Sequence, residues 1–495
     1  SPIAARSSRR DPTKKRCGPV IFSTYAFIFL FLPVTFFGYR LLCVLKLHSL
    51  AKLWLVLASL AFYAIGSAGF VLVFIASVFF NYVVGNLIIK ADGPRAALTR
   101  RILLTVGLVE NIALLGYYKY TNFMINNYIL LTGHTVEFWN IVLPIGISFF
   151  TFQLIAYLVD CYRGEAEDHS VLHFLLFITF FPQLIVGPIV HHKEIIPQFN
   201  NADQPLFNKN NFMLGLFIFC VGCAKKVVLA DPLTAFGEQF YADVAGADVA
   251  TAWVAVLSYT LSYYFDLSGY ADMAIGLGLL FNIRLPQNFE SPYKARNFRE
   301  YWQRWHMSLS RFLNDYVFRT FYRKGRGSFN FYSAVMITFL VSGFWHGAGW
   351  NFVLWGIVNG IFVCMAHFMR RNGLSLPGPL AWLLCFAGVV GTRILFVSSG
   401  TTQAIAVFRK LFDFSEFSGM TASGVVGEIA AFAAYNLYIL VLLAVAMGIA
   451  FFAKNTRQIT ENFRPNAKFA LWGAFLFVLA LSQMTTVSDF LYFQF

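Results

Sequence analysis

Long apolar runs separated by short polar segments are the dominant pattern of this 495-residue chain. A helix needs about 20 apolar residues to cross the hydrocarbon core of a bilayer. Runs of that character occupy roughly residues 20–43, 51–66, 68–89, 102–131, 138–159, 171–191, 212–235, 250–283, 331–368, 379–398, 428–453 and 468–484. The pattern predicts an all-α, polytopic membrane protein with roughly 10–13 transmembrane helices.

A short polar stretch at the N-terminus and the long apolar remainder set the expected domain organisation. Residues 1–19 include the basic stretch SPIAARSSRRDPTKKR, and we expect a basic, disordered tail there. Residues 20–495 are expected to form a single transmembrane domain, with a functional core at about residues 140–370.

The longest weakly hydrophobic segment, residues 284–330, contains an amphipathic pattern over residues 300–322. Apolar residues recur at helical spacing, and polar residues collect on the opposite side. The apolar set is Trp302, Trp305, Leu309, Phe312, Leu313 and Tyr316, and the polar set is Arg304, Ser308, Arg311, Asp315 and Arg319. Such a helix is too polar to cross lipid by itself, so we expect it to be interfacial or re-entrant.

Composition supports the membrane assignment. The chain is 58% hydrophobic and 13% charged, whereas soluble domains carry about 25% charged residues. Its net charge of +14 comes largely from short loops such as 90–101, 319–326 and 370–371. The positive-inside rule accounts for basic loops of this kind, so the charge does not indicate a nucleic-acid partner.

Two histidines are the strongest candidates for chemistry. His346 is the only histidine or charged residue between positions 331 and 366, and glycines and tryptophans surround it in SGFWHGAGWNFVLWG. Imidazole titrates near neutral pH, so His346 is either a general base or proton shuttle, or a histidine bonded to a helix carbonyl. His306 lies on the amphipathic segment, where an interfacial histidine is the alternative.

Other polar residues in apolar surroundings favour a structural role over a catalytic one. Asp266 and Asp272 could orient a histidine, bind a cation or bond to the backbone near a kink, and structural use is favoured. His191 and His192 follow a segment that reads as a broken helix and a short loop, and neighbouring side chains diverge on a helix, which argues against a shared metal.

The remaining motifs exclude several classes of protein. The one C-x-x-C pair, at Cys220 and Cys223, lies in an apolar run and predicts buried small side chains. The sequence has no H-E-x-x-H, G-x-S-x-G or P-loop motif, which disfavours zincins, serine hydrolases and NTPases.

Five stretches together resemble one family. They are LPIGISFFTFQLIAYLVDCYRG (143–164), FFPQLIVGPIVHHKEIIPQF (180–199), YFDLSGYADMAIGLGLLFNIRLPQNFESPY (264–293), FREYWQRWHMSLSRFLNDYVF (298–318) and SGFWHGAGWNFVLWGIVNG (342–360). The chain resembles the membrane-bound O-acyltransferases (MBOAT), within them the bacterial polysaccharide O-acetylases of the alginate O-acetyltransferase type. The similarity runs from about Val20 to the C-terminus.

The resemblance implies a ring of helices around a central funnel, where donor and acceptor approach from opposite sides. The family's intramembrane histidine falls on His346, and the histidine of its W-H-x-S-L-S motif falls on His306. Both are therefore expected to be catalytic. The residues expected to contact substrate are Trp305, Ser310, Arg304, Arg311, Asp315, Trp345 and Asn351.

The implied function is transfer of an acetyl group from a cytoplasmic thioester such as acetyl-CoA, across a bacterial inner membrane, for O-acetylation of an exported alginate- or cellulose-like polysaccharide. No bound cofactor or metal is expected. The expected partners are membrane lipid, a separate periplasmic protein of the SGNH-hydrolase type and a complex that makes and exports the polysaccharide.

Three alternatives remain open at this point. The chain could be a glycan transporter or flippase in which the histidines relay protons. It could be a metal-dependent intramembrane hydrolase, although no third ligand is evident at suitable spacing. It could also acylate a lipid, a protein or teichoic acid.

Overall fold

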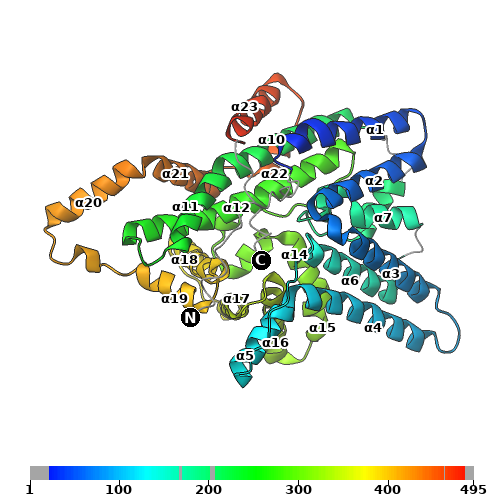
Figure 1. Ribbon diagram of the computed structural model, residues 1–495, viewed down its shortest axis with the longest axis horizontal. Helices are drawn as coiled ribbons and strands as arrows, with labels where there is room; N and C mark the ends of the chain where they lie inside the picture. Colours follow the sequence, from blue (N-terminus) through cyan, green and yellow to red (C-terminus); the bar gives the residue numbers. More distant parts are fainter. Residues whose placement is uncertain (1–21, 167–169, 201–206, 462, 485–495) are drawn as a thin grey trace.

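A computed structural model describes residues 22–166, 170–200, 207–461 and 463–484, and the expected tail at 1–19 lies outside them. Every regular element in these described residues is helical, which confirms the all-α prediction. Figure 1 shows helices that surround a central region crossed by the long helix α12.

The elements of the first third of the chain are η1 (Phe27–Phe31), α1 (Leu32–Val44), α2 (His48–Ser67), η2 (Ala68–Phe70), α3 (Val71–Lys90), α4 (Ala96–Leu115), η3 (Gly116–Tyr120), α5 (Thr121–Thr132) and α6 (Ile147–Arg163).

The middle part contains α7 (Val171–Thr179), α8 (Phe181–Leu184), α9 (His192–Asn200), α10 (Lys209–Ala224), η4 (Lys225–Ala230), α11 (Asp231–Ala242), α12 (Val249–Leu280), η5 (Pro292–Lys294), α13 (Phe298–Arg304), α14 (Met307–Phe312), η6 (Leu313–Phe318) and α15 (Arg319–Phe321).

The last part contains α16 (Gly327–His346), α17 (Trp350–Arg371), α18 (Gly378–Val397), α19 (Thr401–Lys410), η7 (Ser415–Phe417), α20 (Ala422–Tyr435), α21 (Leu437–Phe452), α22 (Thr456–Thr460) and α23 (Ala467–Gln483).

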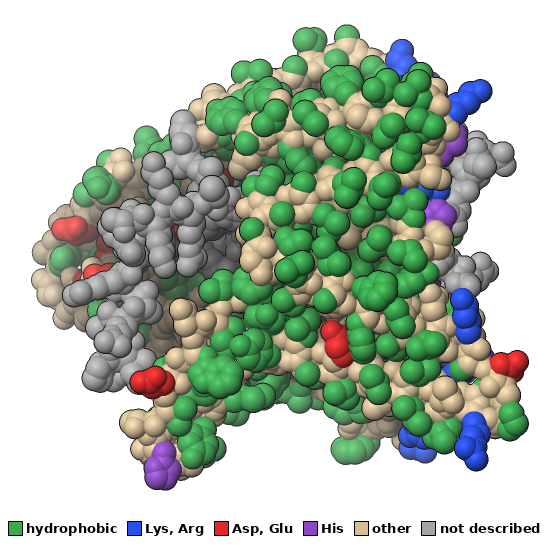
Figure 2. All heavy atoms as spheres, turned by 45° about the vertical axis from the view of Figure 1, so that its right-hand side comes forward, with side chains coloured by type: hydrophobic (Ala, Val, Ile, Leu, Met, Phe, Trp, Pro, Cys, Tyr) green, Lys and Arg blue, Asp and Glu red, His purple; other side chains and the backbone are tan. Residues whose placement is uncertain are grey.

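The outer surface is largely apolar, as a membrane requires. Side chains such as Leu72, Phe79 and Val109 are well exposed, and Figure 2 shows a broad hydrophobic face with lysines and arginines along one margin. By length and composition, six helical segments among the described residues could cross a membrane, or seven if the bent pair α20–α21 is one span.

Some predicted runs are divided rather than continuous. The run 171–191 becomes α7 and α8, with Pro182 near the break, and the run 138–159 begins as irregular chain before α6. Proline lacks a backbone N–H and disfavours a helical residue before it, so the composition of a run does not guarantee one helix.

The central helix α12 packs closely against α10 through glycines. A β-carbon on Gly222 would lie 2.6 Å from the carbonyl oxygen of Gly269, and one on Gly215 would lie 2.6 Å from that of Gly276. Small residues at such positions let two helix backbones approach each other in a membrane. This packing buries nearly every residue of α12 from Tyr259 to Leu280.

Three ion pairs connect η4, which follows α10, to α12 and to the start of α11. Lys226 contacts Asp266 at 2.6 Å and Asp231 at 2.8 Å, while Lys225 contacts Asp272 at 2.6 Å. The two acids of α12 are therefore used in salt bridges between helices, which agrees with the favoured structural interpretation.

Helices α16 and α17 form a tight antiparallel hairpin. A β-carbon on Gly343 would lie 2.4 Å from the carbonyl oxygen of Phe352, and one on Gly356 would lie 2.5 Å from that of Phe339. At the open end of the hairpin Arg371 donates a hydrogen bond to Ser328. The closed end is the turn 347–349, directly after His346.

Candidate functional site

His346 is the last residue of α16 and is buried, with 6% of its surface exposed. Its imidazole lies among aromatic rings, with centroid distances of 4.8 Å to Trp345, 5.0 Å to Trp355 and 5.0 Å to Phe396. The helix ends there because the next residue, Gly347, is extended, and a β-carbon on it would meet the ring of Phe352 at 2.1 Å. The glycine thus permits the turn that presents His346.

His306 lies at a break in the predicted amphipathic helix. Residues 300–322 form α13, α14, η6 and α15 in place of one continuous helix, and the chain turns at Trp305–His306. His306 has a left-handed backbone, with φ of +46°, and is 2% exposed. A positive φ is uncommon outside glycine, so neighbouring groups must hold this conformation.

Asn288 supplies those groups. Its carbonyl oxygen accepts from the amide of Met307 at 2.9 Å, and its side-chain oxygen accepts from the amide and the hydroxyl of Ser308 at 3.1 and 2.9 Å. The hydroxyl of Ser308 in turn accepts from the amide of Ile189 at 2.9 Å. The start of α14 is therefore fixed by two segments that are distant in sequence.

The structure brings the two histidines to the same place. The ring of Phe149 stacks at 6.4 Å on His306 and contacts Trp345, the neighbour of His346, at 5.4 Å. On the other side Phe396 contacts His346 at 5.0 Å and Tyr263 at 5.4 Å, and Tyr263 stacks at 6.3 Å on Trp305, the neighbour of His306. This buried histidine pair, 40 positions apart in sequence, is the candidate site.

Three of the other predicted site residues lie at this pair. Trp305 is buried and stacks on Tyr301 at 5.6 Å, and Trp345 donates its indole N–H to the carbonyl of Ser148 at 3.1 Å. Asn351 donates to the carbonyl of Ser398 at 2.9 Å and so ties the turn after His346 to the end of α18.

Ser310, Arg304, Arg311 and Asp315 make contacts elsewhere within the fold. Ser310 donates to the carbonyl of Trp302 at 3.0 Å. The other three are in ion pairs: Arg304 with Glu300 at 2.8 Å, Arg311 with Glu194 at 2.6 Å and Asp315 with Arg319 at 3.4 Å. Their expected contact with substrate stays a prediction.

Two cavities lie near the histidine pair, one beside the turn that follows His346 and one along α16, and neither is lined by His306 or His346 themselves. One, of about 860 Å³, is lined by the turn 347–349, Lys119, Asn351 and the end of α18. The other, of about 320 Å³, is mostly apolar and is lined by Trp302, Ser310 and the α16 residues from Phe331 to Ser342. A small cavity of about 80 Å³ touches Lys119, Phe149 and Trp345.

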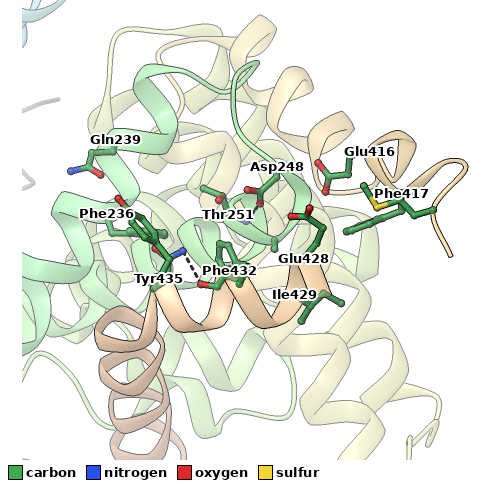
Figure 3. Close-up of a pocket in the computed structure, with 14 residues that line it drawn as sticks. Phe236, Gln239, Asp248, Thr251, Glu416, Phe417, Glu428, Ile429, Phe432 and Tyr435 are labelled. Carbon is green, nitrogen blue, oxygen red and sulfur yellow. Dashed lines mark hydrogen bonds between the residues drawn. The ribbon is translucent and has the colours of Figure 1, made fainter. Parts of the chain in front are cut away.

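A further cavity, of about 650 Å³, is separate from the histidines. It lies between α11, α12 and the bent helix α20, and Figure 3 shows Asp248, Glu416 and Glu428 around it with Phe432 and Tyr435. Glu416 accepts from the amide of Val249 at 3.0 Å, so part of this acidic group fixes the start of α12.

Two basic residues at the site were not anticipated. Lys119, on η3, donates to the carbonyl oxygens of Trp345 and His346. Arg393, on α18, lies over the rings of Tyr263 at 4.0 Å and Trp305 at 5.0 Å. Each is a charged residue in an otherwise apolar run, and that signal in the sequence could have identified both.

His191 and His192 also differ from expectation. Because α9 begins only at His192, both rings approach the same carboxylate, that of Asp160, at 4.0 and 3.3 Å. Tyr316 completes the group by donating to Asp160 at 2.8 Å. This buried cluster joins α6, α9 and η6.

Among the described residues, no group of three or more His, Cys, Asp and Glu side chains has an arrangement suited to a metal ion. The cysteines of the described residues form no disulfide with one another, and Cys220 and Cys223 are buried as expected.

Comparison with known proteins identifies relatives over most of the chain. Residues 113–382 match the MBOAT, membrane-bound O-acyltransferase family. A peptidoglycan O-acetyltransferase of Helicobacter pylori is 37% identical over 96% of this chain and 98% of its own length. A probable alginate O-acetylase AlgI of Pseudomonas aeruginosa is 36% identical over 80% of this chain and 75% of its own. A teichoic acid D-alanyltransferase of Bacillus subtilis is 24% identical over 47% of this chain and 61% of its own.

These relatives and the apolar helices confirm an acyltransferase that spans the bacterial inner membrane several times. The chain belongs to the membrane-bound O-acyltransferase family.

Proposed function

We propose that this protein moves an acetyl group from a cytoplasmic thioester, such as acetyl-CoA, through the inner membrane for O-acetylation of an exported glycan. The observation that carries the proposal is the buried histidine pair, with one cavity beside the turn that follows His346 and another along α16 that reaches Ser342. A donor on one side and an acceptor on the other would meet at the imidazoles.

The chemistry requires a base and a site for negative charge. The attacking hydroxyl loses its proton as its oxygen bonds to the acyl carbon, and the carbonyl electrons move onto the carbonyl oxygen. When that tetrahedral species collapses, the C–S bond breaks and the thiolate leaves, taking up a proton. In this proposal His346 accepts and returns the proton, or carries the acyl group transiently, and His306 positions the thioester or relays the proton.

The charge distribution supports a direction for the transfer. Helices α4 and α16 both begin beside basic loops, at Lys90–Arg101 and Arg319–Arg326, and both end where Lys119 meets His346. Basic loops favour the cytoplasm. The cavity of about 320 Å³ would then face the donor, and the cavity of about 860 Å³ would open to the outside.

Two classes of acceptor fit the relatives. The Helicobacter relative, which matches nearly end to end, is named for peptidoglycan, and the Pseudomonas aeruginosa relative is named for alginate. An exported glycan with free hydroxyls is common to both. The proposal retains a separate periplasmic protein of the SGNH type, which would place the acetyl group on the sugar.

The test uses purified full-length protein in lipid nanodiscs with acetyl-CoA labelled in the acetyl group. His346→Ala and His306→Ala should each lower consumption of the thioester by about 100-fold or more, the usual contribution of a general base. His48→Ala, which alters an exposed histidine at the start of α2, is the matched control and should match the wild type.

An intact thioester after incubation with the wild-type protein and a mixture of soluble glycan and partner would instead favour the transporter. Retained turnover in His346→Ala would remove this residue from the mechanism. Analysis of acetyl esters on cell-wall and secreted glycans from the producing bacterium would assign the acceptor.

A further inference from the structure

The C-terminal carbonyl groups of α16 are capped by side chains from a different helix. The final carbonyl groups of a helix have no partner within it. Here Tyr120 donates to the carbonyl of Phe344, and the ammonium of Lys119 donates to those of Trp345 at 2.6 Å and His346 at 2.8 Å. Two consecutive residues of η3 thus satisfy three consecutive carbonyls that end at the candidate base.

The geometry of η3 places Lys119 where substrate would pass. Residues Gly116–Tyr120 form a π-helical turn between α4 and α5, and such turns are frequent at functional sites. Lys119 lines the outward cavity of about 860 Å³ and also the cavity of about 80 Å³ beside Phe149 and Trp345. It therefore stands between the open cavity and the aromatic cluster of the histidine pair.

Lys119 is a basic residue for which the described part of the chain provides no ion-pair partner. Lys119 from η3 bonds to the carbonyl of His346, and Arg393 from α18 lies 5.4 Å from the ring of Phe396, which contacts His346 at 5.0 Å. A cation at a helix C-terminus is favourable, but a neutral donor could cap carbonyls without the cost of burying a charge.

We propose that Lys119 is a positioning residue of the acyl transfer, which fixes the main chain at His346 and keeps a positive charge beside the reacting groups. The inference rests on the role proposed for His346. As the attacking oxygen bonds to the acyl carbon, negative charge develops on the carbonyl oxygen and the imidazole takes the proton. A fixed ammonium nearby stabilises that negative charge without having to reorient during the reaction.

Two substitutions at Lys119 separate this role from simple capping. Lys119→Met removes the charge and the donors, and Lys119→Arg keeps both. In nanodiscs with labelled acetyl-CoA, we expect Lys119→Met to lower kcat about tenfold or more while KM changes less than about threefold. Lys119→Arg should recover kcat to within about threefold of wild type. Lys209→Met, at an exposed lysine that begins α10, is the matched control.

The thermal unfolding midpoint of each variant is measured beside its kinetics. A kcat of Lys119→Met within about twofold of wild type overturns the inference, as does an inactive Lys119→Arg whose midpoint equals that of wild type. If neither variant can be purified, Lys119→Ala is assayed in isolated membranes with added n-propylamine, where recovered turnover supports the role and absent recovery rejects it.

His346→Ala is run in parallel to separate the two proposals. Full activity in that variant would overturn the proposed function and this inference together. Loss of activity in His346→Ala combined with normal kinetics in Lys119→Met would overturn only the role of Lys119.

Discussion

At the scale of single residues, the backbone of His306 is the most informative feature of the site. A left-handed conformation costs a non-glycine residue roughly 1–2 kcal/mol and persists only where surrounding contacts impose it. The contacts here are those of Asn288 with Met307 and Ser308. Hydrogen bonds from the segment that contains Asn288 therefore hold one imidazole, that of His306, in place.

Replacing Asn288 with alanine should release that placement. The amide and hydroxyl of Ser308 would lose an acceptor in a buried position, which costs about 1–3 kcal/mol of stability. Because small misplacement of a reacting group is costly, we expect thioester turnover to fall about 10- to 100-fold. The measurements are the unfolding midpoint and the kinetics in nanodiscs.

Asn436→Ala is the matched control, because within the described residues the side chain of Asn436 bonds locally, to the carbonyl of Phe432 beside the acidic cavity. Unchanged turnover in Asn288→Ala would show that the function of His306 does not depend on the hydrogen bonds made by the side chain of Asn288.

The sequence could indicate some of these residues but not their contacts. His346 is conspicuous as an ionisable group in an apolar run, whereas His306 is marked by the W-H-x-S-L-S motif, and the ring of Phe149 connects His306 to the neighbour of His346. The break at Trp305 was hidden, because the apolar spacing of Trp302, Trp305 and Leu309 continues through it. Asn288 bonds to the chain directly after the break, and helical periodicity carries no information about such a tertiary contact.

At the scale of elements, the glycines between α10 and α12 set how closely the central helices pack. Gly215 and Gly222 on one helix face Gly276 and Gly269 on the other, so contacts recur after seven residues on each. These positions are visible in the sequence as glycines in apolar runs. The helix against which each glycine packs could not be predicted, because nothing within either run specifies its partner helix.

Gly222→Leu should separate α10 from α12. The new side chain would begin 2.6 Å from the carbonyl oxygen of Gly269 and 2.7 Å from the amide of Met273, and backbone atoms can yield only if the helices move apart. Overpacking of this kind costs about 1–3 kcal/mol, and the nearby ion pair of Lys225 with Asp272 would be stretched. We expect a lower unfolding midpoint and a lower yield of monodisperse protein in detergent.

Gly448→Leu provides the comparison, because a β-carbon at Gly448 of α21 meets nothing within 4 Å. Equal loss of stability in both variants would mean that a larger side chain in any membrane helix, and not the α10–α12 contact, is responsible.

At the scale of the whole molecule, the family and the all-α membrane fold are those that the sequence motifs predicted. The part that could not be predicted is the organisation around the pair, because Lys119, Asn288 and Arg393 come from segments that only the folded chain brings together. Hydropathy identified apolar runs well, but it could not decide which of them form unbroken spans.

The sidedness of the fold gives a prediction for intact cells. Arg371 is exposed at the basic end of α17, and Ser399 is exposed at the rim of the cavity of about 860 Å³. The open end of the α16–α17 hairpin carries the basic loops, which favour the cytoplasm, whereas its closed end carries His346. A cysteine at position 399 should therefore face the periplasm, and one at position 371 the cytoplasm.

The measurement is labelling with a membrane-impermeant maleimide, using Ser399→Cys and Arg371→Cys in a background with Cys17 and Cys364 replaced by serine. The other natural cysteines are buried, so they should contribute little signal. Ser399→Cys should react in intact spheroplasts, and Arg371→Cys only after the membrane is permeabilised. The reverse pattern would place the larger cavity in the cytoplasm, and the donor would then have to approach His346 past Lys119 instead of along α16.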